Sequence, residues 1–291
     1  MKILIYGAGV IGSLYGAYLS EAGYSVSLFA RGKRLKELKE NGLRYYKNKK
    51  ILKANISIMD VLQPNEYFDY IFLTVREEQL HNALKELHNN ISPTIVTMVN
   101  SLENYEVWEK LCGSGRILPA FPGAGGGFSN GILDASLTPS FIQPTTFGEI
   151  NGEKTIRIKI LKNIFKKAHI PYQIVPDMHV WQICHLGMVV PLADAYYDTK
   201  IPNKVSKDKF VMIKTAKQLH NNFVKIHKMG QTISPKKLNL FRLCPVFILS
   251  RILPIVYNSK FGDKFMFQHA MKAKEEMNEL HKQFYSFLNK N

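Results

Sequence analysis

Hydrophobic and polar positions follow two different rhythms along this chain of 291 residues. In the first 170 residues, short apolar runs are separated by amphipathic segments with helical spacing, which predicts strands alternating with helices. The apolar runs lack polar alternation, as is typical of strands buried on both faces of a parallel sheet. We expect strands at 2–6, 24–30, 56–58, 70–75, 94–99, 117–121 and 145–150, with helices over 12–22, 79–89 and 154–168.

After Pro171 and Pro176 the short apolar runs and glycines give way to long helical patterns. The chain is therefore predicted to form an α/β domain with a parallel sheet, residues 1–170, followed by an all-helical domain, residues 177–291. Because ligand sites favour domain junctions, we expect the active cleft between these two domains. Helices are expected over 177–197, 208–229 and 263–288, the last with an apolar face of Met277, Leu280, Phe284 and Phe287.

The first apolar run leads directly into Gly7-Ala8-Gly9-Val10-Ile11-Gly12. A strand that ends in G-x-G-x-x-G and continues into a helix and a second strand binds the pyrophosphate of a dinucleotide. Gly7 permits the tight turn, Gly9 admits the phosphates close to the backbone, and Gly12 lets the helix pack against the strand. The N–H groups that open the helix, at Val10 and Ile11, favour the anion. The first domain is therefore predicted to be a Rossmann-type, dinucleotide-binding domain.

The residue that follows the second strand distinguishes the two nicotinamide dinucleotides. An acidic side chain there would bond to the ribose hydroxyls of NAD, whereas a basic one accommodates the 2′-phosphate of NADP. Arg31 occupies this position, Lys33 and Arg34 follow it, and no acidic residue lies between Arg31 and Glu37. Because a guanidinium fork matches a phosphate, the predicted cofactor is NADP(H). The alternative is a basic turn exposed to solvent.

Polar residues also follow the later strands, and ligand-facing side chains are expected at that edge of an open sheet. Arg76 and Gln79 come after the strand at 70–75, and Asn100 comes after the strand at 94–99. A second glycine cluster, 123–127, lacks the lysine of a phosphate-binding loop. We expect this cluster to form a flexible loop that borders the site.

Composition limits the other classes of function. The most apolar stretch, 243–256, is interrupted by two prolines and an arginine, so we expect no membrane segment and no membrane partner. Three cysteines without metal or redox spacing indicate no metal site and a reducing, cytoplasmic location. The net charge of +16 is compatible with nucleic-acid binding, but the lysines are scattered and no nucleic-acid-binding motif accompanies them. No specific nucleic-acid partner is therefore expected.

Taken together, these features resemble the ketopantoate reductases. The resemblance rests on the glycine motif, Arg31, the Val75-Arg76 pair with Gln79, Val99-Asn100, and the helical second half. It implies NADPH-dependent reduction of a small anionic 2-oxo acid, 2-dehydropantoate, to the 2-hydroxy acid in pantothenate synthesis. It also implies that Asn100 lies near the nicotinamide, that Arg76 replaces a family lysine, and that the helical domain serves substrate binding and formation of a homodimer.

The family's catalytic lysine has no counterpart in this chain. Alignment of the family motif puts Gln182 or Ile183 at that position, depending on the anchor chosen. Reduction of a ketone requires a proton donor or a cation at the developing alkoxide. His185, nearly one helical turn after Gln182, is the candidate replacement, because imidazole donates a proton near neutral pH. The alternative is a hydrogen-bonded helix histidine without a chemical role.

The family's substrate-binding serine and glutamate near the C-terminus are likewise missing as a motif. The corresponding stretch, 267–277, contains Glu275 and Glu276. Glu275 is the candidate for holding a substrate hydroxyl, and a solvated helix face is the alternative. The sequence therefore predicts a divergent reductase that uses His185, Asn100 and Glu275. A second hypothesis is a catalytically silent NADP(H)-binding protein that senses redox state or interacts with a partner.

Overall fold

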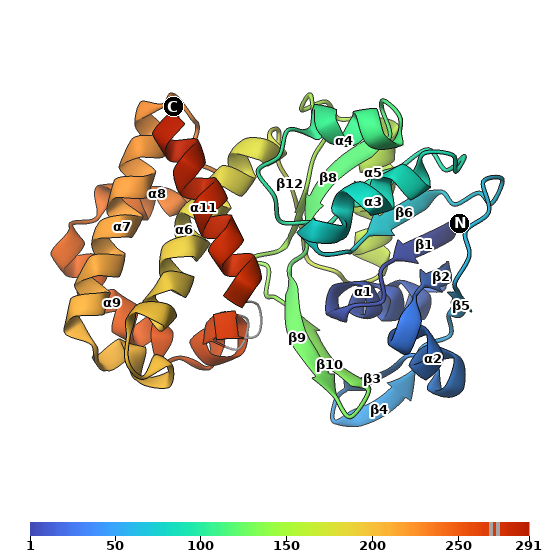
Figure 1. The fold of residues 1–291 in the computed structure, drawn as a ribbon, viewed down its shortest axis with the longest axis horizontal. Coiled ribbons are helices and arrows are strands. Elements are labelled where there is room, and N and C mark those ends of the chain that lie inside the picture. Colours follow the sequence, from blue (N-terminus) through green and yellow to red (C-terminus); the bar gives the residue numbers. More distant parts are fainter. Residues whose placement is uncertain (268–269, 272–273, 291) are drawn as a thin grey trace. The chain divides into compact units, whose positions relative to one another are not determined.

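The computed structural model describes residues 1–267, 270–271 and 274–290 of the chain. The chain divides into two compact units, Met1–Met178 and His179–Asn291. The first unit contains all the strands of the described residues, and the second contains helices only (Figure 1). This arrangement confirms the predicted fold class, an α/β domain followed by an all-helical one.

An eight-stranded sheet forms the centre of the first unit. Its strands are β1 (Lys2–Tyr6), β2 (Ser25–Phe29), β5 (Ser57–Met59), β6 (Tyr70–Leu73), β7 (Ile95–Thr97), β8 (Ile117–Phe121), β11 (Thr145–Phe147) and β12 (Tyr172–Ile174). They lie in the order β12-β11-β8-β7-β6-β1-β2-β5. Neighbours pair in parallel, except that β11 runs antiparallel to β8. β1 lies between β6 and β2, where Ile3 pairs with Val26 of β2 on one side and with Tyr70 of β6 on the other.

Helices pack on this sheet and complete its core. They are α1 (Val10–Glu21), α2 (Gly32–Asn41), α3 (Glu77–Leu87), α4 (Tyr105–Cys112) and α5 (Ile156–Lys167). Phe165 of α5 lies at the centre of an aromatic cluster, with ring centroids of Tyr15, Phe72 and Phe147 at 6.2, 6.0 and 5.4 Å. Since buried aromatic rings dominate core energetics, this cluster fixes α1 and α5 against one face of the sheet.

The second glycine cluster is part of a strand, so the predicted flexible loop is wrong. A smaller sheet contains β3 (Arg44–Lys47), β4 (Lys50–Lys53), β9 (Ala124–Ser129) and β10 (Ile132–Leu137), in the order β4-β3-β10-β9. Gly126 pairs with Ala135, and a Cβ at Gly126 would lie 2.3 Å from the carbonyl oxygen of Asp134. Glycine is therefore required here by the close approach of two strands rather than by flexibility.

The second unit is built around one helix. Its elements are α6 (Met178–Asp198), a 3-10 turn (Pro202–Lys207), α7 (Lys209–Lys228), a second 3-10 turn (Lys236–Leu238), α8 (Asn239–Leu243), α9 (Val246–Tyr257), a π-helical turn (Gly262–Phe267) and α11 (Lys274–Lys290). The side chain of Asn222 in α7 donates to the Gly187 carbonyl, and the Tyr257 hydroxyl in α9 donates to the Leu192 carbonyl. Both bonds reach α6, which is buried along most of its length.

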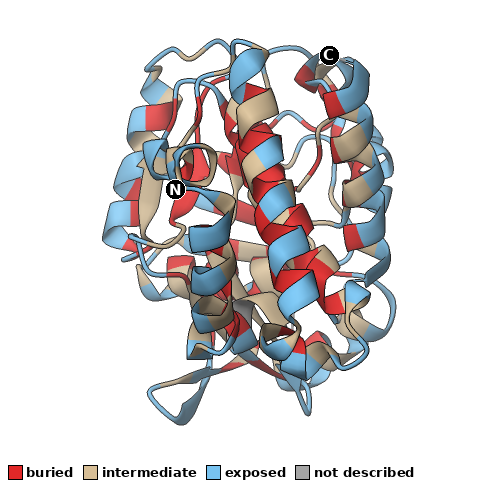
Figure 2. Ribbon diagram, turned by 90° about the vertical axis from the view of Figure 1, so that its left-hand side faces the viewer, coloured by how far each residue is buried: buried red, intermediate tan, exposed pale blue. Residues whose placement is uncertain are grey.

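The helices expected at 177–197 and 208–229 are confirmed as α6 and α7, and Asp208 caps α7 by accepting from the Val211 N–H. Of the predicted apolar face of α11, Phe287 is only half-buried, and Leu288 takes its place in the buried stripe. Buried and exposed positions lie on opposite sides of the peripheral helices (Figure 2). Among the described helices, none combines the length and the apolar character needed to cross a membrane.

The buried hydroxyl of Tyr15 connects α1 with β11 and with the residues between β8 and β9. Tyr15 is fully buried, its hydroxyl lies 2.5 Å from Thr145 Oγ1, and it accepts a hydrogen bond from the Gly123 N–H at 3.1 Å. Tyr15→Phe would leave the Gly123 N–H without this acceptor, so we expect the free energy of unfolding to fall by about 1–3 kcal/mol. Urea denaturation measures the loss. Tyr18→Phe on the same helix is the control, and an equal loss in both variants would contradict the role of this bond.

Candidate functional site

The turn after β1 requires glycine at two positions. Gly7 has a φ of +118°, and a Cβ there would lie 2.9 Å from the Thr74 carbonyl oxygen. A Cβ at Gly12 would lie 2.0 Å from the Gly7 carbonyl oxygen and 2.4 Å from Thr74 Oγ1. The backbone of α1 therefore lies directly against the turn, as the sequence predicts for Gly12.

The first turn of α1 has the properties of an anion site. Gly9 is its N-cap, no side chain caps it, and no acidic residue lies in the first turn. A Cβ at Gly9 would meet no atom within 4 Å, so the space beside the turn is open. The N–H groups of Val10, Ile11 and Gly12 lie where an α-helix leaves its donors without intrahelical partners. Together with the helix dipole, they fit the pyrophosphate of a dinucleotide.

Thr74 connects this turn to the neighbouring strand. Its hydroxyl donates to the Gly7 carbonyl at 2.8 Å, and its N–H donates to the Tyr6 carbonyl at 2.9 Å. The sequence analysis did not single out Thr74, because in the sequence it continues the apolar run of β6. Only the pairing of β6 with β1 places it beside the glycine turn.

The sheet order brings four strand ends together. β2, β1, β6 and β7 are consecutive neighbours and run parallel, so their carboxyl ends share one edge. Arg31 follows β2, Arg76 lies just beyond β6, and Asn100 lies just beyond β7. From β1 the chain proceeds to β2 and β5 on one side, and it then crosses to β6 on the other side of β1. This reversal makes the edge the switch point where open α/β sheets bind ligands.

Arg31 lies between a carboxylate and an aromatic ring. Its guanidinium donates to the Glu86 carboxylate and, at 3.1 Å, to the Tyr6 hydroxyl, while its Cζ lies 4.9 Å from the ring centroid of Phe29. The hydrogen bond from Arg31 holds the pKa of Glu86 below its usual value. With 59% of its side chain exposed, Arg31 remains accessible to a ligand. Glu86 therefore competes for the group that the sequence assigns to the 2′-phosphate.

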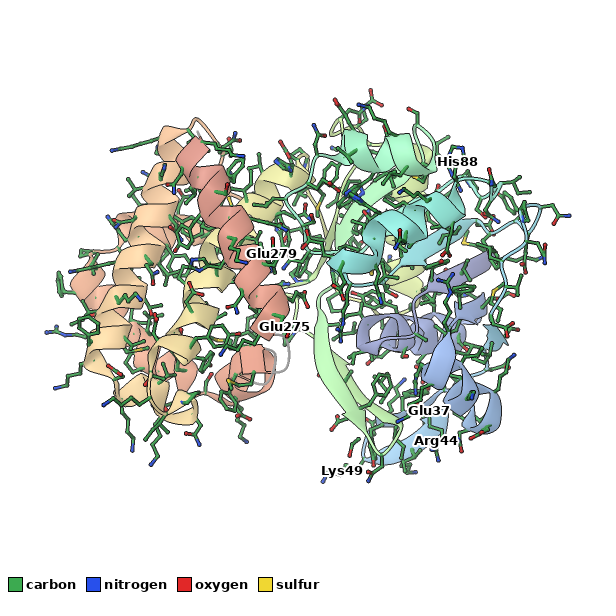
Figure 3. The ribbon with its side chains drawn as sticks, in the orientation of Figure 1. Glu37, Arg44, Lys49, His88, Glu275 and Glu279 are labelled. Carbon is green, nitrogen blue, oxygen red and sulfur yellow. The ribbon has the colours of Figure 1, made fainter. Side chains whose placement is uncertain are left out.

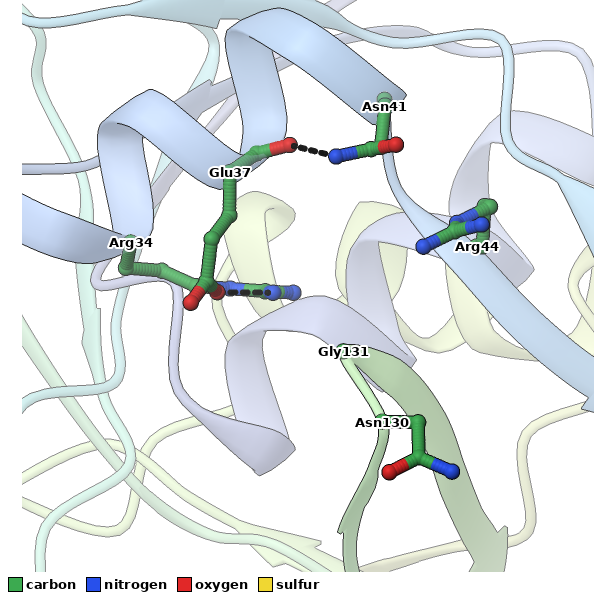
Figure 4. A pocket seen from close by; sticks show the side chains of 7 residues that line it. Arg34, Glu37, Asn41, Arg44, Asn130 and Gly131 are labelled. Atoms are coloured by element: carbon green, nitrogen blue, oxygen red, sulfur yellow. Dashed lines mark hydrogen bonds and ion pairs between the residues drawn. The ribbon is translucent and has the colours of Figure 1, made fainter.

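Arg34 connects the glycine turn to a small cavity (Figure 4). Its Nε donates to the Ala8 carbonyl at 3.3 Å, and its Nη1 donates to the Glu37 carboxylate at 3.3 Å. Arg34 Nη2 and Arg44 Nε are buried and lack hydrogen-bond partners among the described residues. The cavity has a volume of about 230 Å³ and is lined by Arg34, Glu37, Asn41, Gly42, Arg44, Asn130 and Gly131. Two guanidinium groups beside one carboxylate favour an anion there.

The residues after β6 and β7 differ in burial. Arg76 is the N-cap of α3, and its side chain is 77% exposed, with Nη1 3.8 Å from the Glu78 carboxylate. Gln79 is exposed in the first turn of the same helix. By contrast, Asn100 Oδ1 is buried and has no hydrogen-bond partner within the described ranges. Because a buried amide oxygen without a donor is costly, Asn100 is the side chain at this edge best suited to bind a ligand donor.

A cluster that the sequence analysis missed holds the loop that carries Asn100. Glu103 accepts a hydrogen bond from Trp108 Nε1 at 2.6 Å and pairs with His81 Nε2 at 2.6 Å. The three side chains come from α3, α4 and the loop between β7 and α4. The available signal was the polar run at 100–104, but its partners are revealed only by the tertiary structure.

On α6, the positions aligned with the missing lysine are buried. Gln182 is 1% exposed, and His185 is 6% exposed. The His185 imidazole stacks on the Trp181 indole, with ring centroids 5.1 Å apart and planes 7° from parallel. This pairing at i and i+4 follows from helical spacing and fixes the orientation of the imidazole.

The helical unit also contains a partly buried acid–histidine pair. His281 Nδ1 on α11 lies 2.7 Å from the Asp194 carboxylate on α6, and burial raises the pKa of Asp194.

Glu275, the predicted substrate-binding acid, is exposed in the first turn of α11, and Glu279 lies on the same helix (Figure 3). Across the residues described, no group of His, Cys, Asp and Glu side chains is arranged to hold a metal ion.

The strand order and the glycine turn define a Rossmann-type dinucleotide-binding protein. Residues 3–151 match the family described as "Ketopantoate reductase PanE/ApbA", and the chain belongs to this family. Over 111 residues it is 34% identical to a 2-dehydropantoate 2-reductase of Archaeoglobus fulgidus, a match that covers 38% of this chain and 36% of that protein. Over 172 residues it is 28% identical to the uncharacterized oxidoreductase YkpB of Bacillus subtilis, covering 57% and 54%. The chain thus matches between about a third and about half of the length of these relatives.

Solved structures with low sequence identity share the fold over the whole chain. A 2-dehydropantoate 2-reductase of Geobacter metallireducens is similar with a TM-score of 0.73 and 14% identity, covering 99% of this chain and 98% of that one. A D-mandelate dehydrogenase bound to NADH and anilino(oxo)acetate is similar with a TM-score of 0.65 and 16% identity, covering 100% and 99%.

The hydroxyl of Thr74 should be needed for cofactor binding. Thr74→Val removes the hydrogen bond that holds the Gly7 carbonyl, so we expect the dissociation constant for the dinucleotide to rise about fivefold. Fluorescence titration with NADPH measures it. Thr97→Val on the neighbouring strand is the matched control, because Thr97 Oγ1 has no hydrogen-bond partner among the described residues. Equal affinities of the two variants would contradict the role of Thr74.

Proposed function

We propose that the protein is an NADP(H)-dependent oxidoreductase that reduces a 2-oxo acid to the 2-hydroxy acid. The observation that carries this proposal is the glycine turn at the switch point of the sheet, open at Gly9 and flanked by Arg31. Family membership supports the same class of reaction. Residues 1–170 would bind the cofactor, and residues 177–291 would supply side chains to the substrate.

Preference for NADP(H) is supported by the charges beyond β2. Arg31 and Arg34 offer guanidinium groups, and the nearest acid in the sequence, Glu37, already bonds to Arg34. A phosphate carries more charge than the Glu86 carboxylate and accepts two parallel hydrogen bonds, so it can displace this carboxylate from Arg31. Because exposed ion pairs contribute little stability, replacing the carboxylate with a phosphate costs little free energy.

An anionic 2-oxo acid is the substrate class that the relatives support. Four of the relatives that match in sequence are named 2-dehydropantoate 2-reductase, and the similar D-mandelate dehydrogenase was solved with NADH and anilino(oxo)acetate. We therefore propose 2-dehydropantoate as the first substrate to test, with pantothenate synthesis as the pathway. The cysteines are all free thiols, which supports a cytoplasmic location.

The reduced nicotinamide would supply a hydride to the carbonyl carbon of the substrate. The carbonyl oxygen then gains negative charge and needs a proton or a cation. His185 is the proposed proton donor, because it is an imidazole held in one orientation by Trp181 and lies one turn from the position of the missing lysine. Asn100 is proposed to orient the reacting groups through its buried amide, and Glu275 to hold a substrate hydroxyl. Gly7, Gly9, Val10, Ile11, Gly12, Arg31, Arg76 and Gln79 are proposed to bind the cofactor.

Glu86 should lower the affinity for a 2′-phosphate. Glu86→Gln keeps the size of the side chain but removes its charge beside Arg31, so we expect NADPH to bind about fivefold more tightly while NADH affinity stays unchanged. Calorimetric titration with both cofactors measures the two constants. Asp60→Asn, which removes an exposed carboxylate paired with Lys39, is the control. Weaker NADPH binding by Glu86→Gln would contradict Arg31 as the phosphate ligand.

The proposed reaction is tested by following NADPH oxidation with a panel of 2-oxo acids that includes 2-dehydropantoate. For the best substrate, His185→Ala and Asn100→Ala should each lower kcat by about 100-fold, the usual contribution of a positioned acid–base group. His220→Ala on α7 is the matched control, since that imidazole bonds only to the Phe241 carbonyl in the described structure.

The outcomes separate the two parts of this proposal. Turnover that survives His185→Ala would overturn the role of His185 and leave the reductase standing. Tight NADPH binding without turnover of any 2-oxo acid would overturn the reductase and favour a silent NADP(H)-binding protein.

A further inference from the structure

α9 is apolar on both of its sides. Leu249, Leu253 and Tyr257 are buried and attach the helix to its unit. The opposite side exposes large apolar side chains, with 58% of Phe247, 42% of Ile252 and 71% of Ile255 accessible. Large exposed apolar patches mark interaction surfaces, and among the described residues the outer side of α9 stays exposed.

The exposed apolar surface extends into the preceding helix. Leu240 and Leu243 of α8 are 55% and 67% exposed. α8 ends at Leu243, and α9 begins at Val246, so the two helices present apolar side chains within a short stretch of chain. We define the apolar patch as Leu240, Leu243, Phe247, Ile248, Ile252 and Ile255.

The chain segment that contains the apolar patch is basic and contains no acid, and one of its lysines, Lys214, pairs with Asp198 outside the segment. Between Asp208 and Asp263 the chain has ten Lys and Arg residues and no Asp or Glu. This acid-free segment, residues 209–262, has a net charge of +10, whereas the whole chain has +16. None of the ten cations is buried: Lys209, Lys214, Lys217, Lys225, Lys228, Lys236, Lys237, Arg242, Arg251 and Lys260. Arg251 lies within the outer side of α9 itself.

This charge argues against a second copy of the chain as the partner. In a two-fold dimer the same surface faces itself, so the acid-free segment would oppose another acid-free segment. Like charges brought together at an interface are unfavourable. Nucleic acid matches the charge but offers little to six exposed apolar side chains. An anionic lipid surface satisfies both features, because acyl chains accept the apolar side chains and phosphate headgroups attract the cations.

We propose that the outer side of α9, with α8, is a docking surface for anionic lipid membranes. α9 lies in the plane of the interface, with Phe247, Ile252 and Ile255 among the acyl chains and Arg251 extending to the headgroups. α9 has 12 residues, too few to span a bilayer, so the protein binds one face of the membrane. This role is independent of the proposed reductase activity, and it departs from the expectation of no membrane partner that the sequence suggested.

The test uses the full chain and vesicles of phosphatidylcholine with or without about 30% phosphatidylglycerol. Cosedimentation should be strong with phosphatidylglycerol, absent with phosphatidylcholine alone, and lost as salt rises from about 0.05 to 0.5 M. Arg251→Glu should weaken partitioning by about tenfold, since each cation near an anionic surface contributes to binding.

A matched pair of variants tests the apolar contribution. Ile255→Ser removes an exposed side chain from α9, and Ile156→Ser removes one of similar exposure, 74%, from α5. Ile255→Ser should lower the bound fraction at least about threefold, because it removes apolar area from the interface, whereas Ile156→Ser should leave it unchanged. Equal thermal unfolding of both variants establishes that they are folded.

Three results would overturn the proposal. The first is no binding to either kind of vesicle, and the second is equal binding to neutral and anionic vesicles. The third is a stable dimer in sedimentation velocity that Ile255→Ser converts to monomer without any vesicle binding, which would assign the apolar patch to a second copy. NADPH oxidation is measured separately, so failure of the docking surface is distinguishable from failure of the reductase.

Discussion

The close approach of α1 to the end of β1 is the constraint on which the first unit depends. Without a Cβ at Gly12, the helix backbone contacts the Gly7 carbonyl, and the Thr74 hydroxyl bonds to the same carbonyl from the neighbouring strand. One carbonyl therefore fixes the relative positions of β1, α1 and β6. The first turn of α1 is consequently open at the carboxyl edge of the sheet, where the strand order also places Arg31, Arg76 and Asn100. A bulkier residue at either glycine would displace the helix and, with it, the N–H groups offered to an anion.

Near the carboxyl edge of the sheet, two arginines are each paired with a carboxylate. Arg31 bonds to Glu86, and Arg34 bonds to Glu37, so in the structure each guanidinium already has an acidic partner. Such pairs at partly exposed positions are worth about 0–1 kcal/mol, which is less than a doubly charged phosphate gains from two parallel N–H bonds. The carboxylates therefore hold the guanidinium groups in place, and they lower the affinity for a phosphate without preventing its binding. Glu86 also accepts from the Tyr6 hydroxyl, so the position of Arg31 is linked to the last residue of β1.

The parts of this structure that sequence could predict are those encoded locally. The strand at 2–6, the glycine turn and the alternation of buried strands with helices follow from short motifs and periodicity, whereas α2, β3, β4, β10 and β12 were not predicted. Glycines 125–127 suggest flexibility in isolation, yet β10 pairs with them, because the close approach of two strands is a tertiary requirement. Likewise, Glu86 and Glu103 occupy ordinary helix and loop positions until the fold brings Arg31 and His81 to them. α8 and α9 escaped prediction because the prolines at 245 and 254 suggested a broken segment, but Pro245 is the N-cap of α9.

The positive charge of the chain is distributed unevenly along the sequence, and this distribution indicates which ligands the charge can serve. A dinucleotide and a carboxylate substrate can account for the few cations at the sheet edge, such as Arg31, Arg34 and Arg76. They leave the acid-free segment unexplained, because it belongs to the second unit and carries +10 of the +16 in less than a fifth of the residues. Solvation alone would be served by mixed charges, as on α11, where Lys282 lies beside Glu279. The acid-free segment is also where α8 and α9 expose large apolar side chains, and this coincidence points to a partner that is both apolar and anionic.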